Sequence, residues 1–343
     1  MSPVARCLDE APAGWSGLVA TAAAATCAHR PALWSALAAV LPGLTPCLIA
    51  VGEGPEFAGG MPVVVQRRGG FHWLHALPFL LPGAPLARPG REAEVDRAAA
   101  AALAELQREL RAVGGEWALY RPEGPPVTAE ALAIPPGETR RIETAILDLA
   151  GGLEAAWGRI DRKTRAELRH AGSHVVCAEE PDALEEAHAL HLAQSPSWGS
   201  HRPLPLELSR RLLADGGDGF GPLARLFTAR RGRDLLCAVL VLDHPREAMP
   251  WWSGADPEAR RLHAFGRLLW SVAEWAHGAG RCRVNLGASG GSPAVAAFKD
   301  ALGARMLRYP VRWLDASAAS PAGRLLARIQ DRVRAGRPRG EPA

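Results

Sequence analysis

Lysine is rare in this chain, and both lysines stand where an ammonium group could take part in chemistry. Of the 40 basic residues, only Lys163 and Lys299 are lysines. An ammonium group beside a reacting carbonyl stabilises the oxyanion that develops there, or it holds an acceptor phosphate or carboxylate. We therefore predict Lys299 as a catalytic residue. The structural alternative is a surface lysine whose aliphatic stem covers Trp313 or Phe298.

Arginines gather in residues 260–267, where a predicted helix begins. The first amide groups of a helix have no partner inside it, and together with the helix dipole they attract anions such as a pyrophosphate. The alternative is a loop whose arginines face water. The residues of this stretch that we predict to bind a cofactor are Arg261, Ala264, Gly266 and Arg267.

A second basic stretch, residues 162–170, has helical spacing and places Arg162, Arg165 and Arg169 on one face. We predict that Lys163, Arg165 and Arg169 bind an anionic substrate. A solvated helix that pairs with neighbouring acids is an equally plausible alternative.

The two halves of the chain repeat one order of elements. The strands and helices predicted in the first half are strands 47–51, 61–66 and 71–77, a helix from Ala99 to Val113, strand 116–120, helix 127–133 and strand 141–149. The corresponding elements in the second half are strands 226–229, 235–242 and 248–253, helix 265–277, strand 283–286, helix 293–302 and strand 306–314. An edge strand at 175–179 and helices at 181–193 and 205–214 precede them.

This order predicts an α/β fold in which each half is a mixed antiparallel and parallel sheet flanked by helices. A helix between two strands of one sheet requires a right-handed crossover, so the strands that it joins run parallel. We expect the parallel pair to splay beside the crossover helix, because ligands of α/β folds bind at such openings.

The chain resembles the FemAB-like branch of the GNAT superfamily, tandem-GNAT acyltransferases that include the CelD-like acetyltransferases. Three stretches carry the resemblance. Residues 162–171 resemble the basic helix that opens the family's second domain, residues 268–287 resemble its helix–strand core, and residues 298–304 resemble the "FK…FG" stretch before its last strand.

The resemblance implies transfer of an acyl group from acyl-CoA, such as acetyl-CoA, to an amino or hydroxyl group. The expected acceptor is a sugar, a polysaccharide precursor or a small metabolite. The arginine-rich loop is then a relaxed form of the superfamily pattern R/Q-x-x-G-x-G/A, with Ala264 in place of the first glycine. The amides of Trp252 and Ser253 would meet the thioester carbonyl, although a core tryptophan is the alternative for Trp252. Asn285 stands where the family often has aspartate, and we predict it as catalytic together with Lys299.

Three regions are predicted: residues 1–150, a structural GNAT-like domain; residues 151–315, the domain with the active site; and residues 316–343, a basic helix or tail. In the first domain the loop that corresponds to the donor loop, residues 82–90, is rich in proline, which offers no amide donor. The tail carries the whole net charge of +4. The neutral body therefore gives little support for nucleic-acid binding, and tRNA is the one nucleic acid that stays open as a partner.

Cysteine usage and hydropathy predict a cytoplasmic protein without a structural metal. The six cysteines are scattered without metal-ligand spacing, and no apolar run approaches the ~20 residues of a membrane span. His188 and His191 lie one helical turn apart, but they lack a third metal ligand. The sequence leaves the oligomeric state open.

Two other functions stay open. One is an aminoacyl-tRNA-dependent ligase of the peptidoglycan-bridge type, which the neutral body and the absence of that family's coiled-coil arm disfavour. The other is a non-catalytic binding or scaffold protein, for which the weakened donor loop and Asn285 speak.

Overall fold

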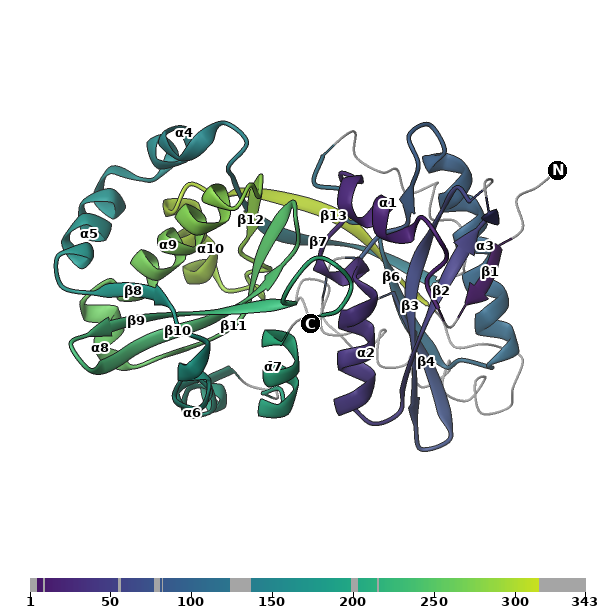
Figure 1. The fold of residues 1–343 in the computed structure, drawn as a ribbon, viewed down its shortest axis with the longest axis horizontal. Coiled ribbons are helices and arrows are strands. Elements are labelled where there is room, and N and C mark those ends of the chain that lie inside the picture. Colours follow the sequence, from purple (N-terminus) through teal and green to yellow (C-terminus); the bar gives the residue numbers. More distant parts are fainter. Residues whose placement is uncertain are drawn as a thin grey trace. The chain divides into compact units, whose positions relative to one another are not determined.

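The computed structural model describes residues 5–8, 10–54, 57–76, 81, 83–123, 137–198, 203–214 and 216–314. The predicted helix 127–133 and the tail 316–343 lie outside these residues. The chain divides into two compact units (Figure 1). Unit 1 extends to Ile142 and also includes the residues from Arg308 onward, and unit 2 is Glu143–Leu307.

Unit 1 contains a mixed sheet in the order β1-β2-β3-β4-β6-β13, with β5 paired to β3. Its helix α3 packs on the sheet through an apolar stripe that includes Ala99 and Leu103. The elements that begin in this unit are β1 (Ala5–Leu8), α1 (Trp15–Thr21), the 3-10 helix η1 (Cys27–His29), α2 (Pro31–Val40), β2 (Leu44–Val51), β3 (Gly59–Arg68), β4 (Phe71–His75), β5 (Leu86–Ala87), α3 (Glu92–Glu109), β6 (Gly114–Ala118) and β7 (Gly137–Asp148).

Unit 2 contains a mixed sheet in the order β7-β12-β11-β10-β9-β8. Helices α9 and α10 lie on one face of this sheet, and α6 and α7 lie on the other (Figure 1). The remaining elements are α4 (Gly152–Arg159), α5 (Arg162–Gly172), β8 (Val176–Glu179), the 3-10 helix η4 (Pro181–Ala183), α6 (Leu184–Gln194), the 3-10 helix η5 (Ser195–Trp198), α7 (Leu206–Leu213), β9 (Ala224–Arg231), β10 (Asp234–Asp243), β11 (Glu247–Ala255), α8 (Pro257–Arg261), α9 (Ala264–Gly278), β12 (Arg283–Asn285), α10 (Pro293–Ala301) and β13 (Arg305–Leu314).

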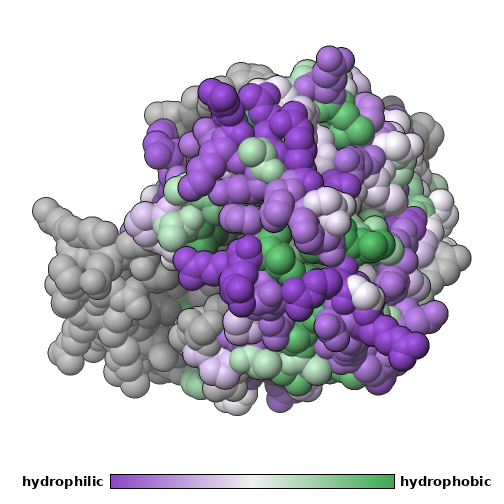
Figure 2. Space-filling view, turned by 90° about the vertical axis from the view of Figure 1, so that its left-hand side faces the viewer, coloured by the Kyte–Doolittle hydropathy of each residue, from purple (hydrophilic) through white to green (hydrophobic). Residues whose placement is uncertain are grey.

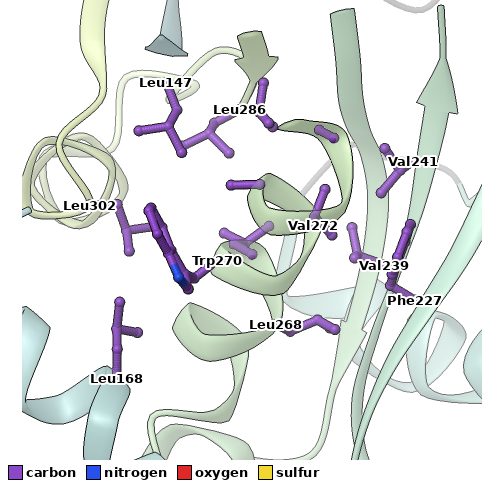
Figure 3. Packing of buried hydrophobic residues seen from close by; sticks show 14 of the residues in the cluster. Leu147, Leu168, Phe227, Val239, Val241, Leu268, Trp270, Val272, Leu286 and Leu302 are labelled. Atoms are coloured by element: carbon purple, nitrogen blue, oxygen red, sulfur yellow. The ribbon is translucent and has the colours of Figure 1, made fainter. Parts of the chain in front are cut away.

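The core of unit 2 is built around α9. Its apolar face, with Leu268 and Val272, packs on Val239 of β10, and Trp270 projects from the other side of α9 toward Leu302 (Figure 3). Local signals set the helix starts. Asp161 accepts hydrogen bonds from the amides of Lys163 and Thr164 at the start of α5.

The predicted order of elements is confirmed in the described residues, and the fold is the expected mixed α/β fold. The last strand of each half, however, belongs to the sheet of the other unit. In β7, Asp148 pairs with Arg283 of unit 2, and in β13, Val311 pairs with Ala118 of unit 1. Periodicity predicts a strand but not its partner, because pairing depends on contacts distant in sequence. No helix within the described ranges is long and apolar enough to cross a membrane.

Candidate active site

Strands β11 and β12 part after two residue pairs, and the parting creates the candidate site. They run parallel and pair at Glu247 with Arg283 and at Ala248 with Val284. Strand β11 continues to Ala255, whereas β12 ends at Asn285. The predicted splay beside the crossover helix is therefore present in unit 2.

Pro250 explains why the parallel ladder ends there. His244 and Glu247 exchange two backbone hydrogen bonds, each 3.1 Å long. Because the direction of backbone groups alternates along an antiparallel pair, Met249 faces β10, and Ala248 and Pro250 face β12. Proline has no amide hydrogen, so the next bond of the ladder cannot form.

A β-bulge then carries β11 further from β12. The register between β10 and β11 shifts between Leu240 and Val241, which stand opposite Trp252 and Pro250, so Trp251 is the additional residue. A bulge bends its strand and increases its twist. Strand β12 meanwhile stays with β7, where the amide of Leu286 donates to the carbonyl of Ala145 at 2.8 Å.

Beyond the bulge, the backbone of Ser253 points into the opening. The Asp256 amide donates to the Leu236 carbonyl at 2.8 Å, which makes these residues a hydrogen-bonded pair of the ladder. By the same alternation, Trp252 and Gly254 direct their backbone groups to β10, and Ser253 directs its groups away from β10. Among the described residues, no acceptor binds the Ser253 amide.

The side chain of Trp252 points elsewhere. It is buried, and its indole Nε1 donates to Ser209 Oγ of α7 at 3.2 Å. Of the two residues predicted at this strand end, Trp252 is thus a core residue on the face of α6 and α7, whereas Ser253 offers its amide to the opening.

Helix α9 begins beside the opening with amides that have no acceptor in its own first turn. The amides of Ala264, Phe265 and Gly266 donate to no described backbone group, and the first turn contains no acidic residue. The preceding His263 adopts the left-handed conformation, with φ of 52°. This conformation costs a non-glycine residue about 1–2 kcal/mol.

The predicted cradle is narrower than the sequence indicates. Ala264 and Gly266 are buried. A Cβ atom on Gly266 would lie 3.1 Å from Leu168 of α5 and 3.8 Å from the ring of Phe298. Access to this helix start is therefore along His263 and the half-buried Phe265.

The two predicted arginines of the loop have different surroundings. Arg267 donates to Glu274 at 3.0 Å and is one quarter exposed, so its charge is already paired along α9. Arg261 is 79% exposed and pairs with Glu258 at 3.0 Å. An exposed ion pair of this kind contributes little, so Arg261 can turn to an anion.

Lys299 is the single buried side chain of α10, whose apolar residues face outward. Its ammonium donates to the carbonyls of Gly287 (2.9 Å) and Ala288 (2.7 Å) in the loop after β12. Burial lowers the pKa of Lys299 to about 8, and the charge of Glu143 opposes this shift.

Asn285 is buried within a hydrogen-bond network at the end of β12. Its Oδ1 accepts from Thr144 Oγ1 (2.6 Å) and from the Gly287 amide (3.0 Å), and its Nδ2 donates to Glu247 Oε1 at 3.3 Å. Glu247 in turn forms a buried ion pair with Arg283 at 2.6 Å. Asn285 and Lys299 thus both fix the wall of the opening that β12 forms.

The basic helix α5 exposes Lys163 and Arg169. Lys163 is 86% exposed and lies 3.8 Å from Glu167, which is also 3.5 Å from His263. The guanidinium of Arg169 lies 5.4 Å from the ring centre of Trp157, and Arg165 is half-buried. Seen from this side of the molecule, hydrophilic residues dominate and hydrophobic residues show between them (Figure 2). The three predicted substrate residues therefore do not converge on one point.

The equivalent region of unit 1 lacks these features. The parallel strands β4 and β6 stay paired up to His75, the last residue of β4. The Ala76 amide, which follows it, still donates to the Glu116 carbonyl of β6. Helix α3 has two acids, Glu92 and Glu94, in its first turn. Negative charge there opposes anion binding.

Sequence reasoning did not identify His191 of α6 as part of this site. Its Nδ1 lies 2.8 Å from the Ser253 carbonyl oxygen, a contact between residues 62 positions apart. The only sequence signal was its spacing from His188.

The described residues contain no group of three metal ligands. The small apolar void near Trp270, lined also by Leu147 and Leu302, has about 10 Å³ of free volume, about one water molecule.

Residues 158–300 match the family described as "Acetyltransferase (GNAT) domain". The match begins in α4 and ends in α10, so it includes the opening, α9 and Lys299. No curated protein sequence matches the chain significantly.

Solved structures resemble the chain over nearly its whole length. The crystal structure of FemX has a TM-score of 0.70 at 10% identity and covers 94% of this chain and 100% of its own. A tandem GNAT protein from the clavulanic acid biosynthesis pathway has a TM-score of 0.52 at 17% identity and covers 92% and 99%. A conserved protein of unknown function from Bacteroides thetaiotaomicron has a TM-score of 0.55 at 10% identity and covers 90% and 99%. At these identities the likeness concerns the fold.

Proposed function

Because this GNAT-type acyltransferase has the tandem GNAT fold of the FemAB-like proteins and its family match lies in unit 2, we propose that acyl transfer takes place at the opening between β11 and β12. The donor would be an acyl-CoA such as acetyl-CoA. The observation that carries this proposal is the Ser253 amide, which faces the opening with no described acceptor.

The Ser253 amide would donate to the thioester carbonyl oxygen. A fixed donor at that oxygen stabilises the negative charge that develops during transfer, an effect of about 10²–10³-fold in rate where one such donor has been removed. The start of α9, free of acids, would face the donor's phosphates along His263 and Phe265. Arg261 would neutralise them.

Lys299 and Asn285 would act by position rather than by contact with the substrate. The hydrogen bonds of both side chains go to the β12 end and its following loop. We therefore propose that they hold this wall at a fixed distance from β11.

The acceptor would be a small molecule or a glycan with an amino or hydroxyl group. Exposed Lys163 and Arg169 favour an acceptor with an anionic group. The free thiols of the described cysteines favour action in the reducing cytoplasm. Unit 1 would serve as structural support, since Glu92 and Glu94 oppose a phosphate at α3.

Two observations favour a second candidate, an aminoacyl-tRNA-dependent ligase. The buried Ala264 and Gly266 narrow the cradle for a pyrophosphate, and the FemX structure covers 94% of this chain. Filter binding of aminoacyl-tRNA, measured against salt concentration, distinguishes this candidate from the first.

The direct test is a titration with acetyl-CoA in which binding is measured by calorimetry and by the shift of the thermal unfolding temperature. We expect stabilisation that grows with the ligand concentration, with CoA and a non-hydrolysable thioether analogue as comparisons. Arg261→Ala should weaken the binding of CoA, and Arg231→Ala, which removes another partner of Glu258, is the matched control. Absence of stabilisation by any acyl-CoA would refute the proposal.

A further inference from the structure

The imidazole of His191 occupies a position that a strand would normally fill. The Ser253 carbonyl points away from β10, toward the side that β12 has left. His191 belongs to α6, which lies on one face of the sheet. Its Nδ1 nevertheless lies 2.8 Å from the Ser253 carbonyl oxygen, which points along the plane of the sheet. The register between β11 and β12 provides no strand partner for this carbonyl, so the imidazole can approach it in the place of one.

The direction of the hydrogen bond fixes the tautomer of His191. A carbonyl oxygen only accepts, so the hydrogen lies on Nδ1 and donates to Ser253. The bond satisfies a carbonyl that the parted sheet would otherwise leave without a partner, which is costly in a buried site. His191 itself is 1% exposed.

Packing against Trp252 and β11 holds the imidazole in this orientation. Its ring centre lies 4.8 Å from that of Trp252, and Trp252 is anchored to Ser209 of α7. The backbone of α6 also packs closely against β11. A Cβ atom on Gly254 would lie 2.4 Å from the backbone nitrogen of His191. This close packing fixes the position of His191 along the strand.

We propose that His191 is a positioning residue of the acyl-transfer site. Its hydrogen bond to the Ser253 carbonyl prevents β11 from pairing again with β12 and holds Ser253 with its amide directed into the opening. This inference rests on the proposed function, in which that amide binds the thioester carbonyl oxygen.

Substitutions at His191 separate this role from simple packing. In His191→Asn the side-chain amide nitrogen stands where Nδ1 stood, so the bond to Ser253 is retained. In His191→Gln the amide group lies one bond further out and the donor is misplaced. His188→Leu is the matched control, since His188 also contacts Trp252 but has its hydrogen bond, 3.0 Å long, with Leu204, away from the opening.

The activity readout is the hydrolysis of acetyl-CoA, in which water accepts the acetyl group and CoA thiol and acetate are released, with the dissociation constant measured by calorimetry. We expect His191→Gln to lower kcat by about 100-fold, the effect of a misplaced catalytic group, and to raise the dissociation constant, because the narrower opening accommodates the thioester less well. His191→Asn should restore kcat, and His188→Leu should leave it unchanged. A wild-type kcat in His191→Gln, or an equal loss in His188→Leu, overturns the inference.

A second readout needs no acyl donor, so it separates the inference from the proposed function. Hydrogen exchange of the peptide that covers Glu247–Ala255 reports whether β11 pairs with β12. We expect slower exchange in His191→Gln than in wild type and wild-type exchange in His191→Asn. Identical exchange in all three proteins overturns the inference even if acetyl-CoA binds. If wild type fails to bind acetyl-CoA while the exchange differs as expected, the proposed donor is wrong and the role of His191 in the opening stands.

Discussion

The ammonium of Lys299 donates a hydrogen bond to the carbonyl oxygen of Ala288 over 2.7 Å, in the loop that follows β12. The bond makes a buried cation part of the wall of the opening. A buried lysine whose pKa differs between the folded and the unfolded state makes the free energy of unfolding depend on pH.

The free energy of unfolding should rise with pH because of Lys299. Its pKa is lowered from 10.5 to about 8 by burial. Between these two values the unfolded chain binds more protons than the native protein, so stability increases as the pH rises from about 8 to 10.5. Over this range the free energy of unfolding of the wild type should rise relative to that of Lys299→Met by on the order of 2–3 kcal/mol. Chemical denaturation at several pH values measures it, and a constant difference would contradict the assignment.

An aspartate in place of Asn285 should destabilise the protein. The new carboxylate would lie beside Glu247, which Asn285 now contacts through Nδ2 at 3.3 Å. A buried charge without a partner costs about 3–5 kcal/mol, and Arg283, already paired with Glu247, compensates only part of it. We expect a loss of about 2–4 kcal/mol at pH 7 in denaturant unfolding.

The loss in Asn285→Asp should shrink at pH 5, where one proton can be shared between the two carboxyl groups. Thr144→Ser keeps the hydroxyl donor to Asn285 and serves as the control. A variant as stable as wild type at pH 7 would show that the site is more solvated than its burial indicates.

Restoring an amide hydrogen at position 250 should narrow the opening. In Pro250→Ala the new N–H faces β12, where the ladder now ends at Ala248. We expect slower hydrogen exchange in this part of β11 and weaker binding of acetyl-CoA. Pro257→Ala, at the first turn of α8 where an amide has no ladder partner, is the control. Unchanged exchange in Pro250→Ala would show that the missing amide hydrogen of Pro250 is not what keeps the strands apart.

The element order was predictable because its signals are local. Glycine breaks and the apolar repeat of α9, with Leu268 and Val272, define elements from neighbouring residues alone. The exchanged positions of β7 and β13 depend on strand partners that lie more than a hundred residues away, and no local pattern encodes them.

The site was predictable only where its chemistry lies in the backbone. The Ser253 amide follows from a strand end, and its position is set by Pro250 nearby. The partners of charged side chains are chosen by the fold. Arg267 is paired with Glu274, and Lys299 bonds backbone carbonyls, which residue type does not reveal. His191 meets Ser253 across 62 positions of sequence.

Two glycines of unit 2 should respond differently to a methyl group. In Gly254→Ala the new Cβ atom would lie 2.4 Å from the backbone nitrogen of His191, so α6 would have to move. We expect a loss of about 3 kcal/mol in the free energy of unfolding. In Gly266→Ala the new atom would meet the end of a flexible side chain, Leu168, at 3.1 Å.

Gly266→Ala should therefore change stability by less than about 1 kcal/mol, helped by the higher helix propensity of alanine. Denaturant unfolding of both variants gives the comparison. Equal losses would mean that α6 is free to shift along β11.

Unit 1 should lose stability in mild acid because of His29. Burial lowers the pKa of His29 to about 4, partly offset by hydrogen bonds with the backbone of Ala84 and Thr26. The unfolded chain takes up a proton near the ordinary value of 6.5, and the native protein does so only near 4. Stability is thus fully present above pH 6.5 and declines as the pH falls toward 4.

The expected decline is on the order of 2–3 kcal/mol. His29→Asn removes the titrating group and should flatten the pH dependence between pH 6.5 and 4. Hydrogen exchange of the peptide around Thr26 and Arg30 reports on the surroundings of His29 directly. A slope that persists in His29→Asn would assign the acid sensitivity to another group.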